Sequence, residues 1–159
     1  MKTIKVRKVL IALDYDPTAQ KVAEEGYAMA KSMNAEVILL HVIAEIDYYA
    51  SLEYSPIMGF EGFMDLTPFP VNSLERLKMA STQFLEKSRL HLEDKSIQIH
   101  VVEGEVADSI IKAAKTLHAD IIVIGSHSKK WLENIVMGSV TEKVLRLSTK
   151  PLFIIPTKK

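Results

Sequence analysis

The chain has 159 residues, of which 48% are hydrophobic and 25% charged, the composition of an ordinary globular domain. Its 20 lysines and arginines balance its 20 aspartates and glutamates, which removes the usual electrostatic argument for a nucleic acid or membrane partner. It contains no cysteine, so disulfides, thiolate metal sites and a cysteine nucleophile are excluded.

The first predicted elements are a strand, a helix and a second strand. The continuous apolar run 9–13 is typical of a strand that is buried on both faces of a parallel sheet. Asp16 followed by Pro17 predicts a helix start, with aspartate as the N-cap and proline in the first helical position. Small apolar residues then recur at helical spacing as far as Met33, and a second buried strand is predicted at 37–42.

The segment 43–71 has neither helical nor strand periodicity. It contains six of the eleven aromatic residues of the chain and five acidic residues, but no basic residue. A long connection with this much apolar surface is more typical of a lid or a contact surface than of a disordered linker. Packing of the segment onto its own domain is the simpler alternative, and the sequence leaves both open.

The next elements are a helix and an edge strand. Asn72 and Glu75 have the spacing of a capping box and predict a helix that runs to about Leu92. Residues 97–102 begin with alternating apolar and polar side chains, which predicts a less buried strand at an edge of the sheet. Gly104 then predicts a turn into a further helix.

The last elements complete an α/β pattern. A buried strand is predicted at 121–124, a helix from about Val140, and a final strand of four apolar residues, Leu152, Phe153, Ile154 and Ile155. Five strands that alternate with four helices predict a three-layer α/β sandwich around a parallel sheet, in a single domain over 1–159. The final strand carries no charge to protect an open edge, so either another strand or a second copy of the chain should cover it.

The connection 125–141 is the most informative stretch for function. Gly125 and Gly138 flank several hydroxyl residues and a pair of lysines. Glycines let backbone N–H groups approach an anion, and the following helix adds its first-turn donors and the positive end of its dipole. The sequence therefore predicts a phosphate site here. Ser139 and Glu142 also have the spacing of a capping box, which gives a purely structural alternative.

Other candidate groups lie outside that connection, and several enzyme signatures are missing. Asp14 follows the first strand, where open α/β sheets place ligand-binding groups, so we expect it to accept a hydrogen bond from an adenine amino group or a ribose hydroxyl. A turn residue is the alternative. The five histidines lack metal-ligand spacing, and only His127 lies in the candidate connection. The P-loop, G-x-G-x-x-G and G-x-S-x-G motifs are absent.

These residues resemble the universal stress protein family over nearly the whole chain. The resemblance includes the strand that ends in Asp14, the His41-Val42 strand end and the connection before the final helix. ATP-binding members of the family carry the motif G-x2-G-x9-G-[ST]. Here Gly125 is followed by Ser128 in the position of the second glycine and, after nine residues, by Gly138-Ser139.

The resemblance implies a flavodoxin-like or adenine-nucleotide alpha-hydrolase-like sheet of order 3-2-1-4-5, and a homodimer in which the strand 152–155 pairs with its copy. It also implies an ATP site, with Mg²⁺ held mainly by the phosphates and Ser139 as a candidate further ligand. The residues that it assigns to this site are Ala12, Asp14 and Val42 for the adenosine, and Gly125, Ser126, His127, Ser128, Lys129, Gly138, Ser139, Val140 and Thr141 for the phosphates.

The leading interpretation is a cytoplasmic, homodimeric universal stress protein that binds Mg-ATP as a regulatory nucleotide in the stress response. No segment approaches the roughly 20 apolar residues that span a bilayer, and no membrane or nucleic acid partner is expected. An alternative is a dimeric interaction module that binds no nucleotide and holds a partner protein through 48–69. A third reading is an enzyme that transfers phosphate, including to itself, although no evident water-activating base accompanies the phosphate site.

Overall fold

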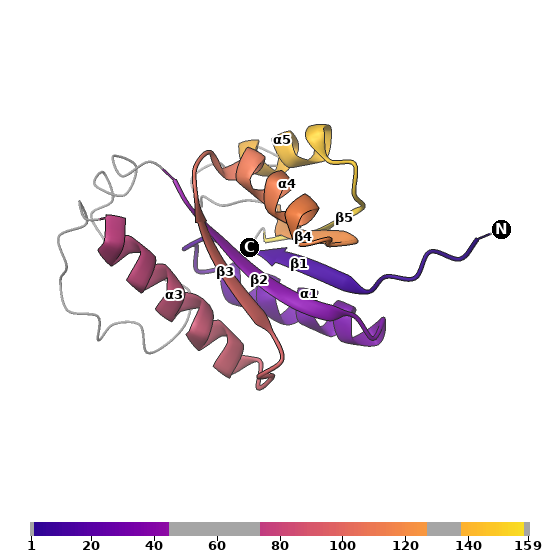
Figure 1. Ribbon diagram of the computed structural model, residues 1–159, viewed down its shortest axis with the longest axis horizontal. Coiled ribbons are helices and arrows are strands. Elements are labelled where there is room, and N and C mark those ends of the chain that lie inside the picture. The colour runs from indigo at the N-terminus through magenta and orange to yellow at the C-terminus, as the bar shows by residue number, and fades with distance from the viewer. Residues whose placement is uncertain (1, 45–73, 127–137, 158–159) are drawn as a thin grey trace.

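The computed structural model describes residues 2–44, 74–126 and 138–157, and Figure 1 shows them as a sheet flanked by helices. Strands and helices alternate along these ranges. Their bounds are β1 Lys8–Ala12, α1 Ala19–Ser32, β2 Glu36–Ile43, α3 Leu74–His91, β3 Gln98–Glu103, α4 Val106–Thr116, β4 Ile121–Gly125, α5 Ser139–Leu147 and β5 Leu152–Ile155.

All strand pairs are parallel, and the five strands lie in the order β3-β2-β1-β4-β5. This confirms the five-stranded sheet of order 3-2-1-4-5. Helices α1 and α3 cover one face and α4 and α5 the other, which confirms the three layers (Figure 1). The chain winds outward in opposite directions from β1, so the switch point of the sheet lies between β1 and β4.

Burial on both faces explains the apolar runs of the central strands. In β1, Val9 and Ile11 pack under α1 and α3, whereas Leu10 packs under α4, and none of the three is exposed. Each such side chain contributes about 1.5–3 kcal/mol of transfer free energy relative to an exposed position. The edge strand β3 has mostly half-buried residues, as its alternating sequence predicts.

The predicted start of α1 is wrong by two residues. The helix begins at Ala19, with Thr18 in the N-cap position and no capping hydrogen bond from its side chain. Asp16 instead accepts hydrogen bonds through Oδ1 from the Thr18 N–H at 2.9 Å and the Thr18 hydroxyl at 2.7 Å. The aspartate thus stabilises a turn around Pro17, because its short side chain reaches the N–H two residues later.

The later boundaries agree with the sequence. Helix α3 ends at His91, one residue before the predicted end, and Gly104 makes the expected turn with a φ of +139°. Asn72 and most of the segment 43–71 lie outside the described residues. None of the helices in the described ranges combines the length and the apolarity that a bilayer crossing needs.

Candidate functional site

The candidate site lies at the carboxyl ends of β1 and β4, next to the switch point. β1 and β4 are neighbours in the sheet, and Ile11 of β1 pairs with Val123 of β4, so the carboxyl ends of the two strands lie side by side. The Gly138 N–H donates to the Ser126 carbonyl at 2.7 Å, which brings the start of α5 to the end of β4. Three segments that the sequence singled out therefore meet at one edge of the sheet: the residues after β1, the residue after β4 and the first turn of α5.

Asp14 is the first polar group after β1. Its Oδ1 accepts a hydrogen bond from the Asp16 N–H at 3.0 Å, so the turn that was the alternative for this residue is formed. Its Oδ2 makes no hydrogen bond to any residue that the structure describes. Asp14 therefore stabilises the turn through Oδ1.

The surroundings of Asp14 favour its neutral form. Desolvation raises the pKa of Asp14 from 3.8 to about 7, the hydrogen bond from Asp16 works against this rise, and the Asp16 charge adds to it. The residue is nevertheless exposed, so solvent reaches the carboxyl group and reduces the upward shift. A raised pKa at the carboxyl end of a strand is typical of functional groups.

The other residues assigned to the adenosine lie beside Asp14. Ala12 ends β1 and is half-buried, and Val42 is 6% exposed near the end of β2. Both side chains belong to the apolar cluster beneath α4. Their assignment to the adenosine stays a prediction.

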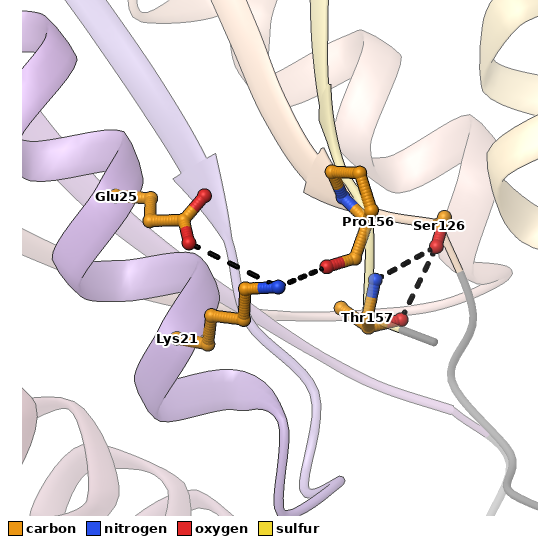
Figure 2. A network of polar contacts seen from close by, with 5 residues as sticks. All are labelled: Lys21, Glu25, Ser126, Pro156 and Thr157. Atoms are coloured by element: carbon orange, nitrogen blue, oxygen red, sulfur yellow. Dashed lines mark hydrogen bonds and ion pairs between the residues drawn. The ribbon is translucent and has the colours of Figure 1, made fainter. Parts of the chain in front are cut away.

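Ser126 forms contacts with the end of the chain. Its Oγ accepts a hydrogen bond from the Thr157 N–H at 3.0 Å and lies 3.3 Å from Thr157 Oγ1, as Figure 2 shows. Lys21 of α1 donates to the Pro156 carbonyl at 2.6 Å and lies 3.9 Å from Glu25. The Ser126 hydroxyl thus joins the end of β4 to the segment that follows β5.

Gly125 is explained by packing in this structure. A Cβ at this position would lie 2.9 Å from Thr157 Cγ2 and 3.0 Å from Val22 Cγ2, both closer than side chains normally approach. Only glycine lets α1, β4 and the chain end meet so closely. The Thr141 hydroxyl donates to the Gly125 carbonyl at 2.7 Å, which ties the first turn of α5 to the same point.

The start of α5 has no side-chain cap. Gly138 occupies the N-cap position, and Ser139 is the first helical residue, so the capping box that Ser139 and Glu142 could form is absent. Ser139 is exposed, and its hydroxyl makes no hydrogen bond within the described ranges. The first intrahelical bond runs from the Glu142 N–H to Gly138, which leaves the preceding N–H groups as donors at the positive end of the helix dipole.

Three of the residues that the resemblance assigns to the phosphates, His127, Ser128 and Lys129, lie outside the described residues. Their assignment stays a prediction. In the part of the chain that is described, no group of three His, Asp or Glu side chains could hold a metal ion.

Two residues near the site were not predicted to act there. Thr157 carried no sequence signal, because its partner lies 31 positions away. His41 did carry one, a polar side chain within the apolar strand β2. It is 3% exposed, and its Nδ1 lies 2.7 Å from the Leu13 carbonyl. Burial lowers the pKa of His41 from 6.5 to about 4, so the ring is neutral near pH 7.

The fold is a parallel α/β sheet, and open sheets of this kind place ligand sites at the switch point where the candidate residues gather. The family model of the universal stress protein family matches residues 5–156, so the chain belongs to the universal stress protein family.

Relatives of known sequence and structure agree with this assignment. Universal stress protein MJ0577 of Methanocaldococcus jannaschii is 31% identical over 159 residues, which cover 98% of each chain. The solved structure of MJ0577 has a TM-score of 0.71 and covers 98% of this chain and 99% of that one, at 28% identity. Universal stress protein YxiE of Bacillus subtilis is 29% identical over 150 residues, 93% of this chain and 97% of that protein.

A solved complex carries a nucleotide on the same fold. It is a universal stress protein in complex with cAMP, with a TM-score of 0.63 and 17% identity, and the match covers 97% of this chain and 99% of the other. At 17% identity, the likeness between the two proteins is one of fold alone.

Proposed function

We propose that this universal stress protein binds ATP, with Mg²⁺, as a regulatory nucleotide in the stress response. The observation that carries the proposal is the uncapped first turn of α5, which begins at Gly138-Ser139 beside the end of β4. Helix N–H groups at the switch point of a parallel sheet favour a phosphate group, and those of Ser139, Val140 and Thr141 have no acceptor among the described residues.

Each part of the nucleotide has a proposed partner. Asp14 Oδ2 accepts a hydrogen bond from the adenine amino group or a ribose hydroxyl, and Ala12 and Val42 provide the apolar wall. The N–H groups of Ser139, Val140 and Thr141 face the phosphates in this proposal. The Ser139 hydroxyl is the candidate protein ligand of the Mg²⁺, since it has no partner among the described residues.

The central part of the phosphate site completes the proposal. His127, Ser128 and Lys129 wrap the phosphates, with Lys129 as the cation. Gly125, Ser126 and Thr141 contribute through their backbone. Gly125 has no room for a side chain, and the hydroxyls of Ser126 and Thr141 already form hydrogen bonds within the protein. Hydrolysis of the bound ATP is expected to be slow, and the cytoplasmic location stays a prediction.

Calorimetry on nucleotide-free protein tests the proposal. Mg-ATP should bind with a dissociation constant in the micromolar range, and AMP and cAMP, titrated in parallel, define the preference among nucleotides. Asp14→Ala should weaken binding. Glu36→Gln is the matched control, since Glu36 is an exposed carboxylate at the start of β2, whereas the site lies where the strands end. Absence of heat with every nucleotide at high micromolar concentration would contradict the proposal.

We also propose a homodimer through the edge strand β5, which comprises Leu152, Phe153, Ile154 and Ile155. This strand lies at the margin of the sheet, and Phe153 is 43% exposed there. An apolar edge without charged side chains favours pairing with another strand. Light scattering should give a dimer for the natural chain and a monomer for Phe153→Lys, whereas Met79→Lys, an exposed apolar residue on α3, should leave the dimer intact.

The rival function is an interaction module that holds a partner protein through 48–69. Deletion of this segment separates the two functions. Nucleotide affinity should survive the deletion if the site at β1 and β4 is independent of the segment, whereas recovery of a protein partner from lysate should drop if the segment holds one. Loss of partner recovery with no nucleotide binding in either protein would favour the rival.

A further inference from the structure

We propose that His41 is a positioning residue for Asp14. Through the hydrogen bond from its ring to the Leu13 carbonyl, it fixes the peptide group that joins Leu13 to Asp14 at the carboxyl end of β1. The role of Asp14 as a nucleotide ligand rests on the proposed function, whereas the positioning itself can be measured without a nucleotide.

The backbone before Asp14 is held on both sides of Leu13 by residues of β2. The Leu13 N–H donates to the Leu40 carbonyl at 2.8 Å, and the Leu13 carbonyl lies 2.7 Å from His41 Nδ1. A carbonyl oxygen only accepts hydrogen bonds, so Nδ1 must carry the proton. The side chain of one strand thereby sets the direction of the peptide that leads out of its neighbour.

The other ring nitrogen shows that His41 is not explained by packing alone. With the proton on Nδ1, Nε2 is an acceptor, and it is buried with no hydrogen-bond partner among the residues that the structure describes. A buried acceptor without a donor costs free energy, and an apolar side chain of similar shape would avoid that cost. The contribution that only a polar side chain makes at this position is the Nδ1 donor.

The residue after Asp14 is anchored in the same cluster. The Tyr15 ring centroid lies 4.2 Å from that of His41 and 5.4 Å from that of Phe84. The Tyr15 hydroxyl also forms a hydrogen bond with the Ser81 hydroxyl on α3. Asp14 is therefore an exposed residue between two neighbours that are anchored in the core, which limits the positions that its carboxylate can adopt.

Two substitutions separate positioning from packing. His41→Leu removes the donor together with the buried acceptor Nε2, so the gain from losing that acceptor offsets part of the cost of leaving the Leu13 carbonyl without its donor, and the protein should stay folded. His41→Asn places an amide N–H₂ near the position of Nδ1 and should restore the bond to Leu13. We expect His41→Leu to weaken nucleotide binding about tenfold, the effect of one lost hydrogen bond, and His41→Asn to recover most of the affinity.

Nuclear magnetic resonance of nucleotide-free protein gives a second readout. The Asp14 amide ¹⁵N shift should move in His41→Leu and return toward its natural value in His41→Asn, and the natural His41 ring should carry its proton on Nδ1. An unchanged Asp14 shift in His41→Leu, or a proton on Nε2, overturns the inference even if nucleotide binds.

The two proposals can fail separately. If the Asp14 amide ¹⁵N shift moves in His41→Leu and returns in His41→Asn, but neither the natural chain nor a variant binds a nucleotide, the proposed function is wrong and the positioning role stands. If both substitutions lower the melting temperature equally and the folded proteins bind nucleotide with natural affinity, His41 has a structural role only and the inference is overturned.

Discussion

The two halves of the candidate site are positioned by different parts of the molecule. After β1, Asp14 lies between residues that contact buried side chains of β2 and α3. After β4, Ser126 is held by Thr157 at the end of the chain and by the backbone of Gly138. The first half is therefore anchored in the core, whereas the second depends on a close approach of backbone segments, which a single added atom can disturb.

The largest expected effect is on the second half. Gly125→Ala adds a Cβ that meets Thr157 Cγ2 at 2.9 Å and Val22 Cγ2 at 3.0 Å. Overpacking of this kind should lower the free energy of unfolding by about 1–3 kcal/mol and weaken nucleotide binding. Urea denaturation measures the change in stability.

A second substitution checks the cause of that effect. Thr157→Ser removes the Cγ2 methyl group but keeps the hydroxyl, so Gly125→Ala should cost less in the Thr157→Ser background than in the natural chain. The double-mutant cycle should give a coupling of at least about 0.5 kcal/mol. Additive effects would mean that the contact with Thr157 is not what requires glycine.

The next largest loss of stability is expected where Ser126 contacts Thr157, after β5. Ser126→Ala removes the acceptor of the Thr157 N–H, which is buried, and should lower the free energy of unfolding by about 1 kcal/mol. The bond from the Gly138 N–H should survive, because it runs to the backbone carbonyl of residue 126, so nucleotide affinity should change less than stability. Ser96→Ala is a control at an exposed turn, where the lost hydrogen bonds are open to solvent. Equal losses in the two variants would contradict a special role for the chain end.

The half of the site around Asp14 should make the free energy of unfolding depend on pH. Because desolvation raises the pKa of Asp14, this carboxyl group holds its proton in the folded state over part of the range between pH 4 and pH 7 in which the unfolded chain has lost it. Its contribution to stability is fully present below the ordinary pKa and falls as the pH rises through this window. The pKa of His41 is lowered to about 4, so its contribution increases over much of the same range, since the unfolded state then binds more protons.

Asp14→Asn isolates the carboxylate from the histidine. Relative to the natural chain, this variant should become more stable as the pH rises from 4 to 7, which urea denaturation at several pH values would show. Nucleotide affinity of the natural chain should increase over the upper part of the window, because the ionised carboxylate is the better acceptor. An affinity that is independent of pH between 5 and 8 would argue against Asp14 as a ligand.

The smallest effect is expected at Lys21. This residue donates to the Pro156 carbonyl and lies near Glu25, but its side chain is 47% exposed (Figure 2). Lys21→Met should change the free energy of unfolding by no more than about 0.5 kcal/mol, and Glu25→Gln should change it less. A larger loss in Lys21→Met would show that the chain end depends on α1 as well as on Ser126.

Local pattern was sufficient for most of the fold. The apolar runs of β1, β2 and β4 have the length and composition of buried strands, and the alternation at 97–102 correctly indicated an edge strand. The strand order came from the family resemblance, because periodicity reports which face of a strand is buried and not which strand is its neighbour. Asp16 was misassigned because a turn and a helix cap have the same local chemistry.

The sequence by itself determined that this is a parallel α/β protein with a connection before the last helix that glycines and hydroxyl residues flank, because those features depend on residues within a few positions of one another. Only the tertiary structure decided how the residues of the site are used. Contacts that span 28 residues, from His41 to Leu13, and 31 residues, from Thr157 to Ser126, depend on how the strands and helices pack. That packing made Gly125 a requirement of close contact, because an added Cβ would meet side chains of Thr157 and Val22, which are distant in the sequence.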